Sequence, residues 1–247
     1  MRSIGPSLPL HPDFGSGRWD GSPIGIPVTV VRRGVRRVHV AFQYASESDR
    51  GPYPIPRTVR FEGGNDRHAI IVDRDRCRLY ELYALRRSGT RWRAGSGAVW
   101  NLRSNRLRPA GWTSADAAGL PILPGLVRYD EVARGRIDHA LRVTVRTTRR
   151  AYVYPARHFA SDDADPDLPP MGLRLRLRRD YPTTGFPRQA RIVLTALKRY
   201  GMLVADNGTS WSVTGVPDAR WRNDDLHTLE RVEGSEFEVV DAASLRP

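Results

Sequence analysis

The sequence has very little cysteine and very little lysine. Among its 247 residues, Cys77 is the only cysteine and Lys198 the only lysine. A single cysteine excludes an intramolecular disulfide and a zinc site built from several cysteines. Because Cys77 alternates with Leu79 in an apolar run, we expect it to be a small buried hydrophobic residue and not a nucleophile.

Long apolar runs and nucleotide-binding motifs are absent as well. No stretch approaches the roughly 20 apolar residues of a membrane span, and residues 1–6 lack the apolar run of a secretory signal. Gly95-Ser96-Gly97 has no lysine or helix behind it, which excludes a phosphate-binding loop, and no serine-centred nucleophile elbow occurs. We expect either a cytoplasmic protein or the mature form of a secreted one, and we favour secretion.

The charge is strongly basic but dispersed. The formal net charge is +13, and all but one of the 40 basic side chains are arginine. Arginine pairs are scattered along the chain, at 32–33, 36–37, 86–87 and 149–150. A nucleic-acid-binding protein more often concentrates basic residues on one helix or loop and places aromatic residues among them. We therefore expect no nucleic-acid partner, whereas an acidic polysaccharide remains open.

The composition is that of a globular protein, with 40% hydrophobic and 27% charged residues. Short runs of β-branched or alternating apolar residues predict strands. These runs lie at 28–31, 35–42, 68–72, 77–85, 125–132, 137–145, 152–154, 173–177, 202–205, 211–214 and 237–240. One segment, 188–200, has helical spacing between Pro187 and Gly201. The block 95–124 is predicted to be mostly loop.

These elements predict a mainly β fold. We expect an antiparallel, jelly-roll-like β-sandwich with one flanking helix near 188–200. Residues 28–247 form this single domain in the prediction, and residues 1–27 form an irregular N-terminal arm, because that segment is rich in Gly, Pro and Ser.

Three polar side chains fall on apolar strand faces. Glu81 shares a face with Leu79, His139 shares one with Leu141, and His68 begins an apolar run. Each is either a hydrogen-bonded core residue or part of a concave sheet face that holds a substrate. In the second case burial would raise the pKa of Glu81, which could then serve as a general acid.

A second set of candidates lies in loops. Glycoside hydrolysis uses two carboxyl groups about 5 to 10 Å apart across the scissile bond. Asp116 with either Asp130 or Glu131 could supply that pair, and Trp112 could stack on a sugar ring. The alternative is a turn role for Asp116 and solvated charges for the other two.

A third cluster contains Tyr154, Arg157 and His158. On an acidic sugar, the arginine would neutralise the carboxylate and the tyrosine or histidine would move the proton, as a lyase requires. No two of His68, His139 and His158 have the local spacing of metal ligands, so we expect no metal.

Several longer strings also carry a resemblance. They include Trp112–Glu131, which reads WTSADAAGLPILPGLVRYDE, and the pattern DRHxxxVDxDxCxLYEL from Asp66 to Leu82. In these strings the chain is similar to a mostly uncharacterised family of secreted bacterial and fungal proteins. The likeness extends from His11 over nearly the whole chain and implies one domain and extracellular use. It implies no catalytic residue.

We expect a secreted carbohydrate-active enzyme, a glycoside hydrolase that acts on a polysaccharide through a carboxylate pair. The catalytic candidates are Glu81, Asp116, Asp130, Glu131, His68, His139 and His158. The substrate-binding candidates are Trp112, Tyr53, Tyr154 and Arg157. We expect a monomer with no cofactor and no membrane partner.

Two alternatives remain open. The first is a polysaccharide-binding module without chemistry, in which exposed Trp19, Trp92, Trp112 and Tyr53 stack on sugars. The second is a polysaccharide lyase for uronic-acid polymers, which the arginine excess and the cluster at 154–158 favour.

Overall fold

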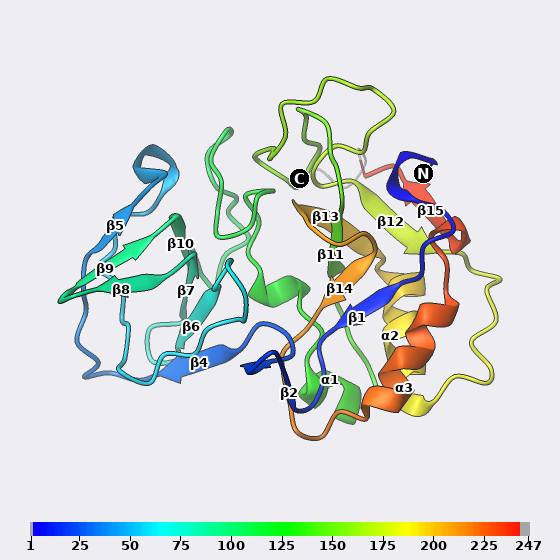
Figure 1. Ribbon diagram of the computed structural model, residues 1–247, viewed down its shortest axis with the longest axis horizontal. Helices are drawn as coiled ribbons and strands as arrows, with labels where there is room; N and C mark the ends of the chain where they lie inside the picture. The colour runs from blue at the N-terminus through cyan, green and yellow to red at the C-terminus, as the bar shows by residue number, and fades with distance from the viewer. Residues whose placement is uncertain (1, 243–247) are drawn as a thin grey trace.

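In the computed structural model, which describes residues 2–242, the chain forms two lobes (Figure 1). The small lobe is one continuous stretch, residues 28–101, and the large lobe combines residues 2–14 with residues 112–242. Most of the buried hydrophobic residues divide in the same way, into one cluster within 31–94 and another that joins 4–14 with 118–237. Each lobe therefore has a core of its own.

The small lobe contains two sheets. The first has the strand order β10-β7-β6-β4 and the second the order β5-β9-β8. Their bounds are β4 Val28–Val31, β5 Val40–Phe42, β6 Ala69–Asp73, β7 Arg78–Tyr83, β8 Arg86–Ser88, β9 Arg91–Ala94 and β10 Ser96–Asn101. Tyr53, Tyr80 and Leu82 lie at the centre of the lobe's core.

The hairpin predicted from residue 68 onward is confirmed. β6 and β7 pair antiparallel, with Ile70 opposite Glu81. Cys77, however, ends the turn between them with a left-handed φ of 50° and is only partly buried. The prediction that it fills the core is therefore wrong, because the turn requires this conformation before β7 begins at Arg78.

The large lobe is built on a six-stranded sheet with the order β1-β14-β11-β13-β12-β15. Its strands are β1 His11–Asp13, β11 Leu141–Val145, β12 Arg174–Leu177, β13 Met202–Asn207, β14 Ser212–Thr214 and β15 Phe237–Val240. The predicted flanking helix is confirmed as α2 Arg188–Arg199, which buries Val193, Leu194 and Leu197 against this sheet.

The remaining elements are short. They are α1 Tyr129–Ala133, α3 Asn223–His227, the two-stranded β2 Arg18–Trp19 with β3 Ser22–Pro23, and 3-10 turns at Arg2–Ile4, Ala45–Glu47, Leu123–Gly125, Thr228–Arg231 and Gly234–Glu236. None of the helices within residues 2–242 is long and apolar enough to cross a membrane.

The fold is mainly β, as predicted, but its sheets are mixed and not purely antiparallel. The pairs β1/β14, β4/β6, β5/β9 and β11/β13 run parallel. Parallel neighbours need long crossovers, and the long segments between β4 and β6 and between β11 and β13 provide them. Local alternation of residues does not distinguish the two directions.

Several boundaries also differ from the prediction. Part of the arm expected to be irregular, His11–Asp13, is strand β1 on the sheet edge. The strand predicted at 125–132 contains helix α1 instead, and the predicted loop block contains strand β10. The pairing of β1 with β14 joins residues about 200 positions apart, so no local pattern reveals it.

Strand β11 carries a charged side chain into the interior of the large lobe. The strand lies inside the six-stranded sheet, and all five of its residues are buried. The exposed fraction of Arg142 on this strand is therefore only 7%. A buried guanidinium requires an anionic partner.

Candidate functional site

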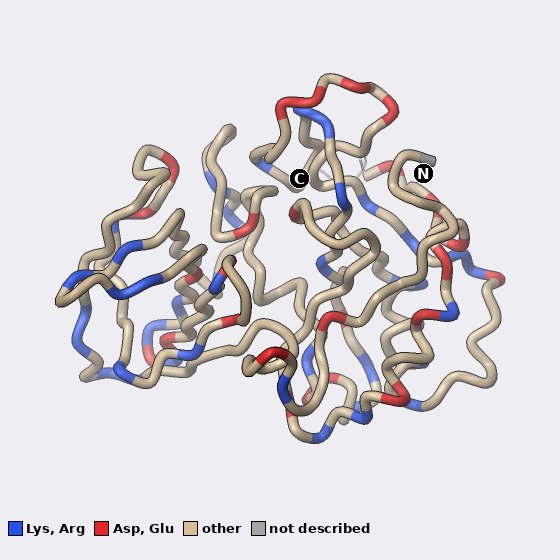
Figure 2. The backbone as a smooth tube through the Cα atoms, viewed as in Figure 1, with Lys and Arg blue, Asp and Glu red and all other residues tan. Residues whose placement is uncertain are grey.

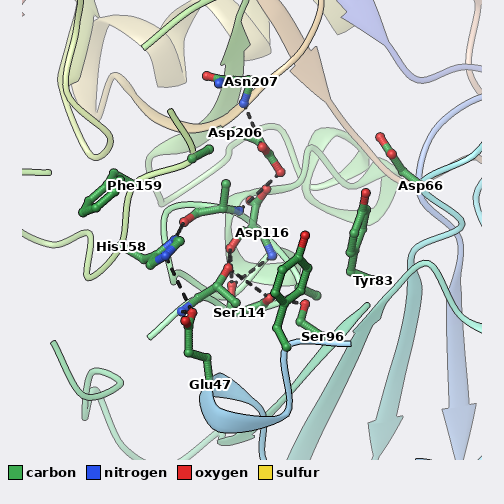
Figure 3. Close-up of a pocket in the computed structure, with 15 residues that line it drawn as sticks. Glu47, Asp66, Tyr83, Ser96, Ser114, Asp116, His158, Phe159, Asp206 and Asn207 are labelled. Carbon is green, nitrogen blue, oxygen red and sulfur yellow. Dashed lines mark hydrogen bonds and ion pairs between the residues drawn. The ribbon is translucent and has the colours of Figure 1, made fainter. Parts of the chain in front are cut away.

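A cleft of about 410 Å³ opens between the two lobes (Figure 3). A small third hydrophobic cluster, which includes Ile70, Ala115 and Leu126, joins residues of both lobes. The lining residues from the small lobe are Tyr44, Glu47, Asp66, Tyr83 and Ser96, and those that follow in the chain are 113–117, 158–160, Asp206 and Asn207. We call this space the interlobe cleft.

Asp116 is the anionic partner of Arg142. The Arg142 Nε and Nη2 atoms donate to the two Asp116 carboxylate oxygens, each at 2.8 Å, and Nη1 donates to the Thr214 hydroxyl at 2.7 Å. Ser114 turns the loop here, because its hydroxyl accepts from the Asp116 N–H at 2.9 Å. Asp116 is 1% exposed, and both of its oxygens are engaged. The Asp116–Arg142 ion pair is therefore a buried part of the structure that supports the floor of the cleft.

A β-bulge brings Asp206 to this ion pair. β13 pairs regularly with β11 up to Val204, but then Asp206, and not Ala205, lies opposite Thr144. In a regular strand Asp206 would share the core-facing side of Val204, two residues earlier. The extra residue moves it to the side of Thr144 and Arg142, where it lines the cleft.

The two carboxyl groups differ in their contact with Arg142. Burial raises the pKa of Asp206 above its ordinary value, and the adjacent, hydrogen-bonded Asp116 carboxyl raises it further. Arg142 opposes this rise, but its Nη2 atom lies 3.9 Å from the Asp206 carboxylate. Asp116 thus forms the ion pair with Arg142, and Asp206, whose pKa is raised, retains a proton near neutral pH. Its side chain is 25% exposed, and its oxygens also accept the Asn207 N–H at 2.8 Å and the Ala117 N–H at 3.3 Å.

Glu47 and His158 lie at another side of the cleft. The Glu47 carboxylate accepts the Thr113 N–H at 3.1 Å, and the His158 Nε2 atom is 3.6 Å away from it. The His158 Nδ1 atom lies 3.0 Å from the Ala117 carbonyl oxygen, to which Nδ1–H donates. The ring of His158 stacks on Phe159. Among the catalytic candidates, Asp116 and His158 therefore both line this cleft.

The lining is acidic and partly aromatic. Its charged side chains include four carboxyl groups but no arginine or lysine; they belong to Glu47, Asp66, Asp116 and Asp206. Tyr44, Tyr83 and Phe159 supply rings. The cleft lining therefore offers an anionic ligand no arginine or lysine, although basic residues are spread over both lobes (Figure 2).

Glu81 does not reach the cleft. It is fully buried, and its carboxylate accepts the N–H groups of Ile122 at 3.0 Å and Leu123 at 2.8 Å and the Trp100 indole N–H at 3.0 Å. Burial raises its pKa to about 7, although the three donors favour the ionised form. Through these hydrogen bonds, Glu81 attaches the loop 112–126 to β7. It does not face the cleft, where it could donate a proton to a ligand.

His68 is also a core residue. Its Nδ1 atom makes a short contact with Glu62, and its Nε2 atom lies 3.0 Å from the Ala115 carbonyl oxygen. Both ring nitrogens face acceptors, so the imidazolium form fits. Burial would lower the pKa of His68, but hydrogen bonding to Glu62 and its charge raise it to about 9. His68 thereby ties the small lobe to the cleft loop.

The structure does not bring Asp130 or Glu131 to Asp116. Asp130 is an exposed residue of α1 that pairs with Arg220 at 2.8 Å. Glu131 pairs with Arg128 and with His139, whose Nε2 atom is 3.2 Å away. These hydrogen bonds outweigh burial and lower the pKa of Glu131. His139 itself lies before β11 and not on it.

The four substrate-binding candidates lie outside the interlobe cleft. Tyr53 is completely buried and donates its hydroxyl to the Asp49 carbonyl at 2.6 Å, so the expectation of an exposed ring is wrong. Trp112 packs beside Arg108, and the Arg157 Nε atom donates to the Arg108 carbonyl at 2.9 Å. Tyr154 is half-buried and does not line the cleft.

Sequence reasoning missed Asp206, Glu47, Tyr44 and Tyr83 as cleft residues. The only signal for Asp206 was its place after a predicted strand, because the bulge that redirects it depends on its neighbour β11. Glu47 comes from a loop next to three prolines, and only the packing of the lobes places it near His158.

Within residues 2–242, no group of three or more His, Cys, Asp and Glu side chains is arranged to hold a metal ion. Comparisons with protein-family models, with curated proteins and with solved structures found no match for this chain.

Proposed function

We propose that the protein is a carbohydrate-active enzyme, a glycoside hydrolase that cleaves a neutral polysaccharide in the interlobe cleft. The observation that carries the proposal is the Asp206 carboxyl, which lies beside the Asp116–Arg142 ion pair, has a raised pKa and is partly exposed in the cleft. A carboxylic acid that stays protonated near neutral pH is the group that a glycosidase uses to protonate its leaving group.

Asp116 is a positioning residue in this proposal. It hydrogen bonds with Asp206, so the two groups are too close to flank a glycosidic bond, for which about 5 to 10 Å is needed. Both of its oxygens also accept from Arg142. Asp116 acts by keeping the proton on Asp206.

The second carboxylate must come from elsewhere in the cleft, and we assign Glu47 to this role. The Thr113 N–H and His158 hold its carboxylate in place. Asp206 donates its proton to the glycosidic oxygen as the C–O bond breaks. Glu47 takes a proton from the water that attacks the anomeric carbon.

The lining supports a neutral substrate. A uronic-acid lyase needs a cation to neutralise the substrate carboxylate, and the residues that line the cleft include no arginine or lysine. Tyr44, Tyr83 and Phe159 offer ring faces for sugars. The jelly-roll-like sandwich, the secreted location and the family resemblance remain predictions on which this mechanism does not depend.

The test is an assay of purified protein against neutral and acidic polysaccharides, read by reducing ends and by the ultraviolet absorbance of unsaturated products. We expect new reducing ends without that absorbance. Asp206→Asn should lower kcat by about 100-fold or more, because a general acid contributes this much. The matched control is Asp162→Asn, whose side chain is 95% exposed.

Each other outcome contradicts the proposal in a distinct way. Unsaturated products would show a lyase, and full activity of Asp206→Asn would remove the general acid from this position. Binding of glycans by the unaltered protein without any products would show a binding module.

A further inference from the structure

A second cleft lies next to the hairpin formed by β2 and β3. It has a volume of about 590 Å³ and shares no lining residue with the interlobe cleft. Trp19 stands at its edge with 80% of its surface exposed, the largest exposed fraction among the large hydrophobic residues that the structure describes. Burying an indole ring would stabilise the folded protein. Trp19 does not contribute in this way, so its exposure points to a role other than packing.

The hairpin fixes the backbone on either side of its turn, next to Trp19. Asp20 and Gly21 form the turn with positive φ angles of 47° and 72°, the conformation of a tight two-residue hairpin turn. The Arg18 guanidinium closes the turn with two hydrogen bonds to the Gly21 carbonyl, at 2.9 and 2.6 Å. The backbone that carries Trp19 is therefore ordered before a ligand binds, which lowers the entropic cost of binding there.

The rest of the cleft is open, and its largely apolar lining also contains carboxyl groups. Three carboxyl groups line it, those of Asp13, Asp20 and Glu62. Gly64 also lines it, and no heavy atom lies within 4 Å of the position that a Cβ would occupy there. A ligand can therefore approach the backbone at this wall. As in the interlobe cleft, the lining includes no arginine or lysine.

We infer that this cleft is a second binding site for a neutral glycan, with Trp19 as its stacking platform. A sugar ring has an apolar face of C–H groups that packs on an indole, and hydroxyl groups that donate to carboxylates. An anionic ligand would meet carboxyl groups and no arginine or lysine. The inference shares its ligand class with the proposed function but needs no catalysis.

The test measures binding to soluble neutral polysaccharides by affinity electrophoresis, with polygalacturonate as the acidic comparison. All proteins carry Asp206→Asn, so that the glycan stays intact. We expect Trp19→Ala to weaken binding of a neutral glycan about fivefold, which corresponds to roughly 1 kcal/mol of ring stacking, and Trp19→Phe to restore most of it. Leu102→Ala, an exposed apolar residue outside both clefts, is the control.

The experiment separates this site from the proposed catalytic site. With Asp206 intact, Trp19→Ala should raise KM for the polymer and leave kcat on short oligosaccharides unchanged, whereas Tyr44→Ala should impair both. The binding result would remain valid even if the catalytic proposal proved wrong. Equal binding by Trp19→Ala, no neutral glycan bound by the protein that retains Trp19, or preference for polygalacturonate would each overturn the inference.

Discussion

At the scale of single residues, one buried arginine organises the site. Arg142 makes two hydrogen bonds to Asp116 and approaches Asp206 only to 3.9 Å. Of the two neighbouring aspartates, only Asp116 is ion-paired at hydrogen-bond distance, and burial raises the pKa of Asp206. This difference, and not the presence of carboxylates as such, makes the cleft a candidate for acid catalysis.

Asp116→Asn tests this relation through the pH profile. A general acid works only while protonated, so kcat/KM falls as pH rises through the pKa of Asp206. The substitution removes the negative neighbour that raises this pKa and leaves the positive Arg142 that lowers it. We expect the alkaline limb to move to lower pH. An unchanged limb in folded protein would contradict the assignment.

Glu81 provides the opposite test, because the structure assigns it a structural role. Glu81→Gln should retain turnover within a few-fold, because Glu81 does not line the cleft. Glu81→Ala leaves three buried N–H donors without an acceptor. It should lower the free energy of unfolding by about 3 kcal/mol, measured by urea denaturation. Loss of activity in folded Glu81→Gln would restore Glu81 as a catalytic candidate.

At the scale of elements, the loop 112–126 positions the site, and the glycines in and beside it are not equivalent. Gly111 and Gly119 both have positive φ angles, of 80° and 70°. A Cβ at Gly111 would meet no heavy atom within 4 Å, whereas a Cβ at Gly119 would lie 2.5 Å from the Trp112 carbonyl oxygen. The chain thus contains a matched pair of glycines within a few residues.

We expect Gly119→Ala to destabilise the protein by at least about 1 kcal/mol more than Gly111→Ala, since both introduce the same strain and only one adds a backbone clash. Gly119→Ala should also lower turnover, because Asp116 precedes it by three residues in the same turn. Thermal unfolding and kcat measure the two effects. Equal effects of the two substitutions would show that the turn is free to adjust.

At the scale of the whole molecule, the sequence predicted the mainly β class, the β6–β7 hairpin and α2. Each depends on neighbours within a few residues. It did not predict the parallel pairs or the two lobes, which depend on distant partners. Asp116 was identified as a candidate, whereas Asp206 was not, because its orientation is set by a bulge against another strand.

The contact of His68 with the Ala115 carbonyl joins the lobes and gives a prediction for stability against pH. The pKa of His68 is raised from 6.5 to about 9 on folding. Its contribution is therefore fully present below pH 6.5 and is lost as pH rises through about 9. The loss is on the order of 3 kcal/mol for a shift of this size.

Urea denaturation of the unaltered protein and of His68→Gln, at several pH values, measures this contribution. The gap between their free energies of unfolding should be largest near pH 6 and should shrink between pH 6.5 and 9. It should also shrink in acid below 4.5, because folding lowers the pKa of Glu62 from that value. A gap independent of pH would mean that His68 is not charged in the folded protein.

The pairing of β1 with β14 has a consequence for synthesis on the ribosome. Every strand partner within the small lobe is available once residue 101 has emerged, because its two sheets use only residues 28–101. His11 can pair with Ser212 only after residue 212 has emerged. Likewise, the carbonyls of Ile4 and Gly5 can accept the Trp211 indole N–H only after residue 211 has emerged. The middle of the chain can thus fold first, whereas residues 4–13, which leave the ribosome before it, can pair only after residues 211–214 have emerged.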